Sequence, residues 1–217
     1  MRFTPVTRSV ANSKKLIEGF ALGFAYAAPI GAQNVYVIQS ASGGPLRMSV
    51  RVALAVTAMD ITLALACLYG LGAVLGWLPW LRAAMTVVGC AYLLWIGVNL
   101  ARSRAEEDVE GTTGRDVTHS YAWSRVAVAA FTLTWLNPQA ILDGTLLLGG
   151  FRAQLGDGEL PLFIIGMATA SAMWFHALTA LVSSCRSRFG PRVMMWINRV
   201  CGAALCALGL RLGLGLL

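Results

Sequence analysis

Six long apolar stretches dominate the pattern of hydrophobic and polar positions along this chain of 217 residues. Each continues for about 18 residues or more with almost no charged side chain, which is the length that a helix needs to cross about 30 Å of hydrocarbon. Short segments rich in glycine, proline and charged residues separate the stretches. The pattern therefore predicts six transmembrane helices, at about residues 16–40, 52–76, 82–101, 126–150, 161–183 and 199–217.

The most polar segment, residues 102–125, contains five acidic residues and four arginines and divides the chain into two sets of three helices. We expect it to be a solvated linker between a first repeat, residues 16–101, and a second repeat, residues 126–217. Residues 1–15 carry four basic side chains and are expected to form a basic N-terminal tail. The first apolar stretch continues to the length of a full span, so a cleaved signal peptide is not expected.

The composition strengthens this interpretation, because 57% of the residues are hydrophobic, 12% are charged and the mean hydropathy is +0.67. An ordinary globular chain carries about 25% charged residues. A soluble fold of this size would lack the polar atoms that must cover its surface. The composition therefore excludes a disordered chain, a cytosolic fold and a secreted disulfide scaffold, and it indicates an integral membrane protein.

The net charge of +7 comes mostly from arginines that stand singly between the apolar stretches, so a nucleic-acid partner is not expected. The loops after the first, third and fifth helices hold two, four and four basic residues, whereas the loops after the second and fourth hold one each. The positive-inside rule then places the first group of loops in the cytoplasm and both termini outside. The four basic residues of the N-terminal tail favour the opposite orientation, but they are fewer than the ten basic residues in the first group of loops.

The two halves of the chain resemble each other when they are aligned at an offset of about 110 residues. Pro29 then falls on Pro138, and Asp60 falls on the small polar residues around Ser171. Each half has an odd number of spans, three, so the two halves must cross the bilayer in opposite directions. Inverted repeats of this kind are typical of secondary transporters. The predicted fold is an all-α integral membrane protein with six transmembrane helices arranged as two inverted three-helix repeats.

Both aligned prolines predict a break in a transmembrane helix. A proline frees the carbonyl group four residues earlier, here that of Ala25 or Thr134, and in lipid this group needs another partner. Small or polar residues accompany both prolines: Gly31, Gln33, Asn34, Asn137 and Gln139. We therefore expect irregular backbone around Pro29, Gly31 and Pro138 to line a polar cavity. The alternative is two ordinary kinks that neighbouring helices satisfy.

Two aspartates, Asp60 and Asp143, lie roughly 10 to 14 Å inside the predicted second and fourth helices. A carboxylate at this depth costs at least about 2.5 kcal/mol, so it should be paired, protonated or exposed to water. Arg211 is the nearest basic residue in an apolar stretch, and it can extend its side chain to the membrane surface. The acids therefore predict a site for protons or a cationic substrate, although protonated acids that join helices are an alternative. Trp135, beside the second break, either stacks on a substrate or packs.

Motifs for nucleotide hydrolysis, nucleophilic catalysis or metal binding are not found in the sequence. We therefore expect no enzymatic activity, no cofactor and no metal. The five cysteines lack redox or metal-binding spacing and are expected to be unpaired thiols. A membrane thiol-redox carrier is the alternative from another functional class, and it needs a reactive cysteine near the break in both halves.

These residues resemble the LysE family of bacterial amino-acid exporters, most closely its lysine and arginine exporter branch. The similarity runs from about residue 16 to the end of the chain. The matching segments are 19–23, 29–34, Asp60, 134–138 with Asp143, and 171–175.

The resemblance implies a secondary active exporter of basic L-amino acids, lysine or arginine, in the bacterial cytoplasmic (inner) membrane, driven by the proton motive force. Its partners would be a cationic amino acid, protons and the lipid bilayer. Together with Trp135, the predicted substrate-binding residues are Gln33, Asn34, Asp60, Asn137 and Asp143. The neutral-substrate branches generally lack the aspartate at position 143, which favours lysine or arginine. Export of a neutral amino acid or another small cation is the alternative.

Overall fold

The computed structural model describes residues 5–29, 31–71, 74, 77–102, 123–152, 154–156, 158–185 and 191–214. The elements of secondary structure in these ranges are all helical, which confirms the all-α prediction. They are α1 (Pro5–Ala27), α2 (Ala32–Gly43), α3 (Leu46–Leu68), α5 (Pro79–Arg102), α8 (Trp123–Trp135), α9 (Pro138–Gly144), the π-helix η1 (Thr145–Gly149), α10 (Gly150–Arg152), α11 (Leu160–Cys185) and α12 (Pro191–Leu214). The predicted linker, residues 102–125, lies mostly outside the described residues.

Two of these helices, α3 and α11, are long and apolar enough to cross a membrane. A shorter apolar helix, Ala83–Asn99, lies within α5. The first and fourth predicted spans are divided into shorter helices, because the chain breaks at their prolines. The helices thus occupy the predicted stretches. That all six stretches cross the bilayer stays a prediction.

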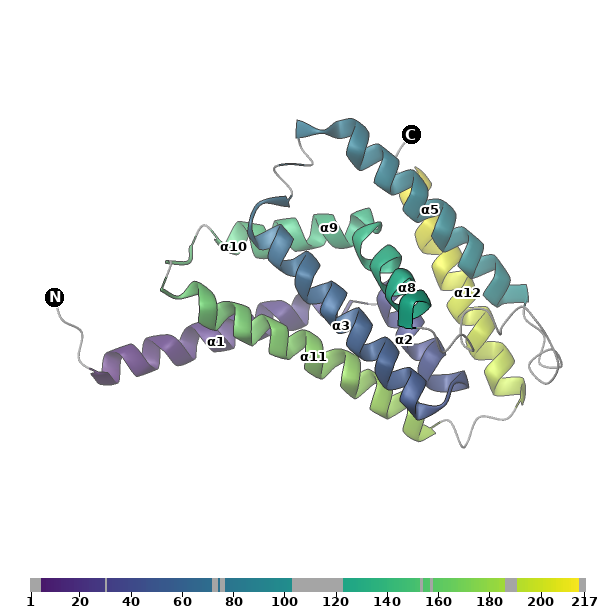
Figure 1. The fold of residues 1–217 in the computed structure, drawn as a ribbon, viewed down its shortest axis with the longest axis horizontal. Helices are drawn as coiled ribbons and strands as arrows, with labels where there is room; N and C mark the ends of the chain where they lie inside the picture. The colour runs from purple at the N-terminus through teal and green to yellow at the C-terminus, as the bar shows by residue number, and fades with distance from the viewer. Residues whose placement is uncertain are drawn as a thin grey trace.

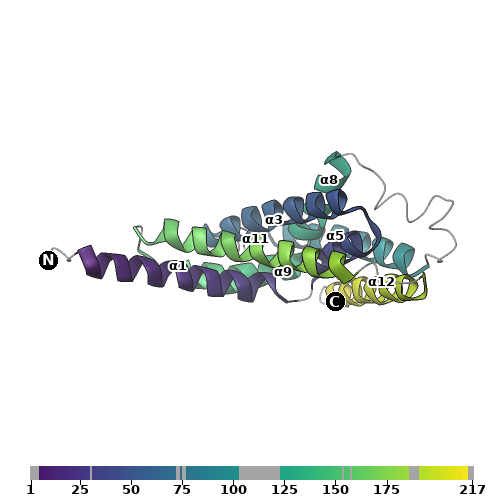
Figure 2. The same cartoon turned by 90° about the horizontal axis from the view of Figure 1, so that it is seen from below.

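The helices pack in pairs that join the two halves of the chain. α1 packs against α11, which it crosses at an angle in Figure 1, and α5 packs against α12; in the perpendicular view of Figure 2 the two helices of each pair lie side by side. α8 packs against α3, and α3 also packs against α11. The first helix of each half therefore contacts the second helix of the other half, and the third helices contact each other.

Glycines allow α1 and α11 to approach with their backbones in contact. A Cβ atom at Gly19 would overlap the backbone of Phe163, and one at Gly166 would overlap the backbone of Leu16. Gly23 faces the backbone of Met167 in the same way. Small residues four positions apart, here Gly19 and Gly23, are typical of closely packed membrane helices.

This packing predicts that Gly166→Ala lowers the free energy of unfolding by about 1–3 kcal/mol, because the added methyl group overlaps backbone atoms that cannot move aside. Gly150→Ala is the matched control, since a Cβ atom there meets no other atom within 4 Å. Thermal unfolding of the purified proteins in detergent measures both effects. Equal unfolding temperatures for the two variants would contradict the packing argument.

The segment expected as a basic tail belongs largely to α1, which begins at Pro5. A proline at the first helical position does not interrupt the hydrogen bonds of the helix, and no glycine or second proline follows before Lys15. The Nζ atom of Lys15 lies 3.0 Å from Glu18 Oε2 and 3.6 Å from Glu159 Oε2. The first ion pair lies within α1, and the second connects α1 to the residue that precedes α11.

Candidate functional site

The chain leaves helical geometry at both predicted break positions. α1 ends at Ala27 and α2 begins at Ala32, while α8 ends at Trp135 and α9 begins at Pro138. Pro138 thus occupies the first position of α9, where its missing N–H group leaves no hydrogen bond unmade.

An asparagine side chain pairs with the backbone at each break. Asn34 Nδ2 donates hydrogen bonds to the carbonyl oxygens of Pro29 (2.7 Å) and Ala27 (3.3 Å). At the other break, Asn137 Oδ1 accepts a hydrogen bond from the backbone N–H of Gln139 at 3.2 Å and caps α9. These side chains supply partners that a lipid environment cannot supply.

Gln33, beside the first break, bonds to a residue beside the second break. Its Nε2 atom donates a hydrogen bond to Thr134 Oγ1 at 2.8 Å, and both side chains are buried. The Gln33 side chain also interacts with the carboxylate of Asp60. One amide therefore links α2, α8 and α3.

Asp60 is enclosed between α3 and α11, with only 1% of its surface exposed. Its Oδ2 atom accepts a hydrogen bond of 2.7 Å from the buried hydroxyl group of Ser171. The described part of the chain provides no basic side chain within ion-pair distance of this carboxylate. Because only uncharged donors hold it, Asp60 can bind a proton or a small cation.

A cavity of about 170 Å³ lies at the two breaks, where α1, α2, α9 and α12 meet. On the same measure one water molecule needs only about 10–15 Å³, so the cavity is large enough for a small solute. Its walls are formed by Tyr26, Ala27, Pro29, Gly31, Ala32, Gln33, Asn137, Gln139, Ala140, Asp143, Leu208 and Arg211.

The cavity contains an acid, a base and several uncharged polar groups. Asp143 is half-buried, and its Oδ1 atom accepts a hydrogen bond from Gln139 Nε2 at 2.8 Å. Arg211 reaches the cavity from the last turn of α12. The buried hydroxyl group of Tyr26 has no hydrogen-bond partner among the described residues. A solute with both charged and hydrogen-bonding groups suits this lining.

The structure brings some of the predicted site residues together and separates others. The cavity lining includes Pro29, Gly31, Gln33, Asn137 and Asp143. It does not include Asn34, Asp60 or Trp135.

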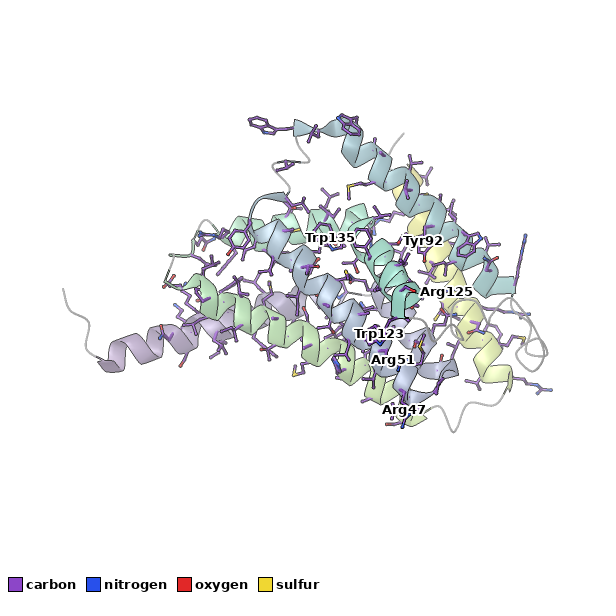
Figure 3. The ribbon with its side chains drawn as sticks, viewed as in Figure 1. Arg47, Arg51, Tyr92, Trp123, Arg125 and Trp135 are labelled. Atoms are coloured by element: carbon purple, nitrogen blue, oxygen red, sulfur yellow. The ribbon has the colours of Figure 1, made fainter. Side chains whose placement is uncertain are left out.

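The side chains of Trp135 and Asn34, two predicted substrate-binding residues, form hydrogen bonds with other side chains of the protein. Trp135 Nε1 donates a hydrogen bond to Thr62 Oγ1 at 3.3 Å, and the Trp135 ring stacks on Phe131 at 6.0 Å between centroids. Figure 3 shows Trp135 on the broken helix, apart from the labelled arginines. Asn34 Oδ1 accepts a hydrogen bond from Trp174 Nε1 at 2.8 Å. Asn34 therefore has a direct role in shaping the first break.

Among the lining residues that were not predicted as site residues, Tyr26 and Arg211 have the side chains best suited to binding a ligand. Tyr26 lies within an apolar stretch, although its position one helical turn before Pro29 is a signal that places it at the break. Arg211 lies near the end of the last span, where snorkelling was the simpler explanation. The π-helix that follows Asp143 was also unexpected; such segments are frequent at functional sites.

The five cysteines are all free thiols, as expected. Cys67 Sγ lies 3.7 Å from the carbonyl oxygen of Ile141, so it contacts the second broken helix. The other four cysteines lie on α5, α11 and α12, and none of them lines the cavity. In the part of the chain that the structure describes, no group of three or more His, Cys, Asp or Glu side chains could hold a metal ion.

Comparisons with known proteins give one consistent family. The profile of the LysE type translocator family matches residues 24–215. The arginine exporter protein ArgO of Pectobacterium atrosepticum is 32% identical over 197 residues, which cover 90% of this chain and 95% of that protein. ArgO of Escherichia coli K12 is 31% identical over 196 residues, covering 90% and 91%, and ArgO of Klebsiella pneumoniae is 31% identical over 189 residues, covering 87% and 88%. No solved structure was found to match the chain. The chain therefore belongs to the LysE type translocator family and is a transporter, not an enzyme.

Proposed function

We propose that this protein exports basic L-amino acids, arginine or lysine, from the cytoplasm and that the proton motive force drives the export. Membership of the LysE translocator family supports amino-acid export, and the relatives described above are arginine exporters. The observation that carries the choice of cargo is the acid Asp143 in the wall of the cavity.

The carboxylate of Asp143 is available to a cationic ligand. Its hydrogen-bond donor is the neutral amide of Gln139, and it has no ion-pair partner among the residues that the structure describes. A guanidinium or ammonium group would form charge-assisted hydrogen bonds with this carboxylate, which are about twice as strong as neutral ones. The Tyr26 hydroxyl group and the amides of Gln33 and Asn137 offer further hydrogen bonds to the same ligand.

Asp60 is the residue that we assign to proton coupling. Ionised Asp60 carries an enclosed negative charge, whereas protonated Asp60 is neutral and tolerates burial. Gln33 contacts Asp60 and also lines the cavity. A cation in the cavity would favour the ionised form of Asp60, and protonation of Asp60 would weaken cation binding. This mutual effect is what the exchange of a proton for a cationic amino acid requires.

The proposed architecture is two inverted three-helix repeats that rock around the cavity. The cross-packing of α1 on α11 and α8 on α3, with α5 on α12, has the pattern that a two-fold axis between the halves would produce. Asp60 and Ser171 occupy aligned positions in the two halves and hydrogen-bond to each other. Residues at equivalent positions of two repeats can contact each other only where both lie close to the axis that relates the repeats.

In the proposed topology the protein is a multi-pass inner-membrane protein with both termini outside the cytoplasm. Arg47 and Arg51 on α3 and Arg125 on α8 lie at the same end of the molecule in Figure 3. Arg51 Cζ lies 5.8 Å from the centre of the Trp123 ring, which holds the beginnings of α3 and α8 together. The beginning of α1 lies at the opposite end in Figure 1. The positive-inside rule places the arginine end in the cytoplasm.

This topology predicts that single cysteines at Leu46, Thr112 and Ser187, introduced into a cysteine-free background, are protected from a membrane-impermeant thiol reagent in intact cells. Leu46 is suitable because 57% of its surface is exposed. A cysteine at Gly158, in the loop before α11, should be labelled in the same cells. Labelling of the first three sites with protection of Gly158 would invert the topology.

Counterflow in proteoliposomes tests the proposed cargo. We expect labelled arginine and lysine to accumulate in vesicles preloaded with unlabelled arginine, and labelled threonine not to accumulate. Rapid threonine counterflow without arginine or lysine counterflow would support the neutral-substrate alternative instead. The cysteine-free protein should transport normally; loss of transport with normal membrane insertion would favour the thiol-redox alternative.

A further inference from the structure

Arg211 is a charged residue for which the proposed mechanism has no role so far. Among the described residues that line the cavity it is the one basic side chain, and it comes from α12, whereas Asp143 comes from α9. Arg211 forms no ion pair within the described residues, with Asp143 or with any other acid. The same small cavity therefore presents two opposite charges that do not neutralise each other.

This separation indicates the chemistry of the ligand. Opposite charges attract each other where water is partly excluded, yet the half-buried Asp143 and the exposed Arg211 line the same cavity without pairing directly. Two unpaired charges are instead complementary to a solute that carries both signs. An amino acid with a cationic side chain has both: the side chain suits Asp143, and the α-carboxylate suits a guanidinium group.

We propose that Arg211 binds the α-carboxylate of the cargo and thereby restricts the cavity to free amino acids. The planar guanidinium group can donate two parallel hydrogen bonds to a carboxylate, which an ammonium group cannot do. This inference rests on the proposed function and deepens it, because it adds the second charge that the site recognises. The competing explanation is that Arg211 interacts only with water and lipid headgroups at the membrane surface.

The test compares each amino acid with its carboxamide, which keeps the side chain and removes the negative charge. Ligand-induced thermal stabilisation of the purified full-length protein in detergent gives the dissociation constants. We expect the wild-type protein to bind L-arginine at least about tenfold more tightly than L-argininamide. Arg211→Gln should weaken arginine binding by about tenfold and leave argininamide binding unchanged, so that the preference disappears. Arg211→Lys should retain part of the preference.

Arg199→Gln is the matched control, because Arg199 lies on the same helix, is exposed and does not line the cavity. It should keep the wild-type preference for arginine over argininamide. The proposal is overturned if Arg211→Gln keeps that preference, or if it weakens acid and amide binding equally, as a structural role would. If Arg211→Gln does not fold, the wild-type protein and Arg211→Lys carry the test, and equal wild-type affinity for acid and amide overturns the proposal.

The same experiment with L-threonine and L-threoninamide separates this proposal from the choice of a cationic cargo. If the wild-type protein binds threonine and not arginine, the proposed cargo is wrong. The role of Arg211 is then still decided by whether the wild-type protein prefers threonine over threoninamide and Arg211→Gln loses this preference. If the wild-type protein binds neither amino acid, both proposals fail.

Discussion

Asp143→Asn is expected to abolish export of arginine and lysine while folded protein remains in the membrane. The substitution removes the acidic charge of the cavity without a change in side-chain size, and the asparagine oxygen can still accept the hydrogen bond from Gln139. Loss of a charge-assisted hydrogen bond should weaken binding of either amino acid by about 10- to 100-fold. Efflux of labelled arginine from cells and ligand-induced stabilisation of the purified variant measure the two effects.

Glu159→Gln is the control for Asp143→Asn, since it neutralises an acid that lies outside the cavity. It should leave arginine binding and export at wild-type levels. Export at the wild-type rate by Asp143→Asn would contradict the proposed site. A loss of thermal stability with unchanged arginine affinity would show instead that Asp143 joins helices.

Asp60→Asn should have an equally large effect, but on a different step. The variant cannot exchange a proton at position 60, so a proton gradient should no longer accelerate arginine efflux. The neutral asparagine resembles protonated Asp60 and should weaken arginine binding, but Asp60 does not line the cavity. Arginine counterflow, which needs binding and reorientation alone, should therefore continue at saturating arginine. The two assays in the same proteoliposomes therefore separate coupling from binding.

Ser171→Ala is the companion to Asp60→Asn, because it removes the hydroxyl donor and retains the carboxylate. We expect Ser171→Ala to keep a response to the proton gradient and Asp60→Asn to lose it. Equal losses of thermal stability in both variants, with gradient-driven efflux intact in both, would indicate that the Asp60 to Ser171 hydrogen bond is structural.

The positions of the helices and their breaks could be predicted from the sequence, because they depend on local features. Apolar stretches place α3 and α11, and the prolines at positions 29 and 138 coincide with the two interruptions. The beginning of α1 could not be predicted in the same way. Basic residues suggested a tail, but Pro5 is compatible with a helix start and Lys15 has acidic partners, one of them 144 residues away in the sequence.

The difference between the two aspartates depends on the way in which the helices pack, and so it does not follow from the sequence. Both acids lie at similar depths in predicted spans, yet Asp60 is enclosed with Ser171, 111 residues away, while Asp143 lines the cavity beside Gln139. Arg211 lines the same cavity as Asp143 because of the position of α12, and no local sequence pattern predicts that position.

Gradient-driven efflux tests the central claim most directly. Proteoliposomes that contain the wild-type protein and labelled arginine are given a proton gradient of the orientation found in cells, with the acidic side corresponding to the periplasm. The account predicts that the gradient accelerates arginine efflux from wild-type vesicles, that Asp60→Asn loses this acceleration but retains counterflow, and that Asp143→Asn shows neither. Arginine efflux that is the same in all three proteins, or wild-type efflux that does not respond to the gradient, would contradict it.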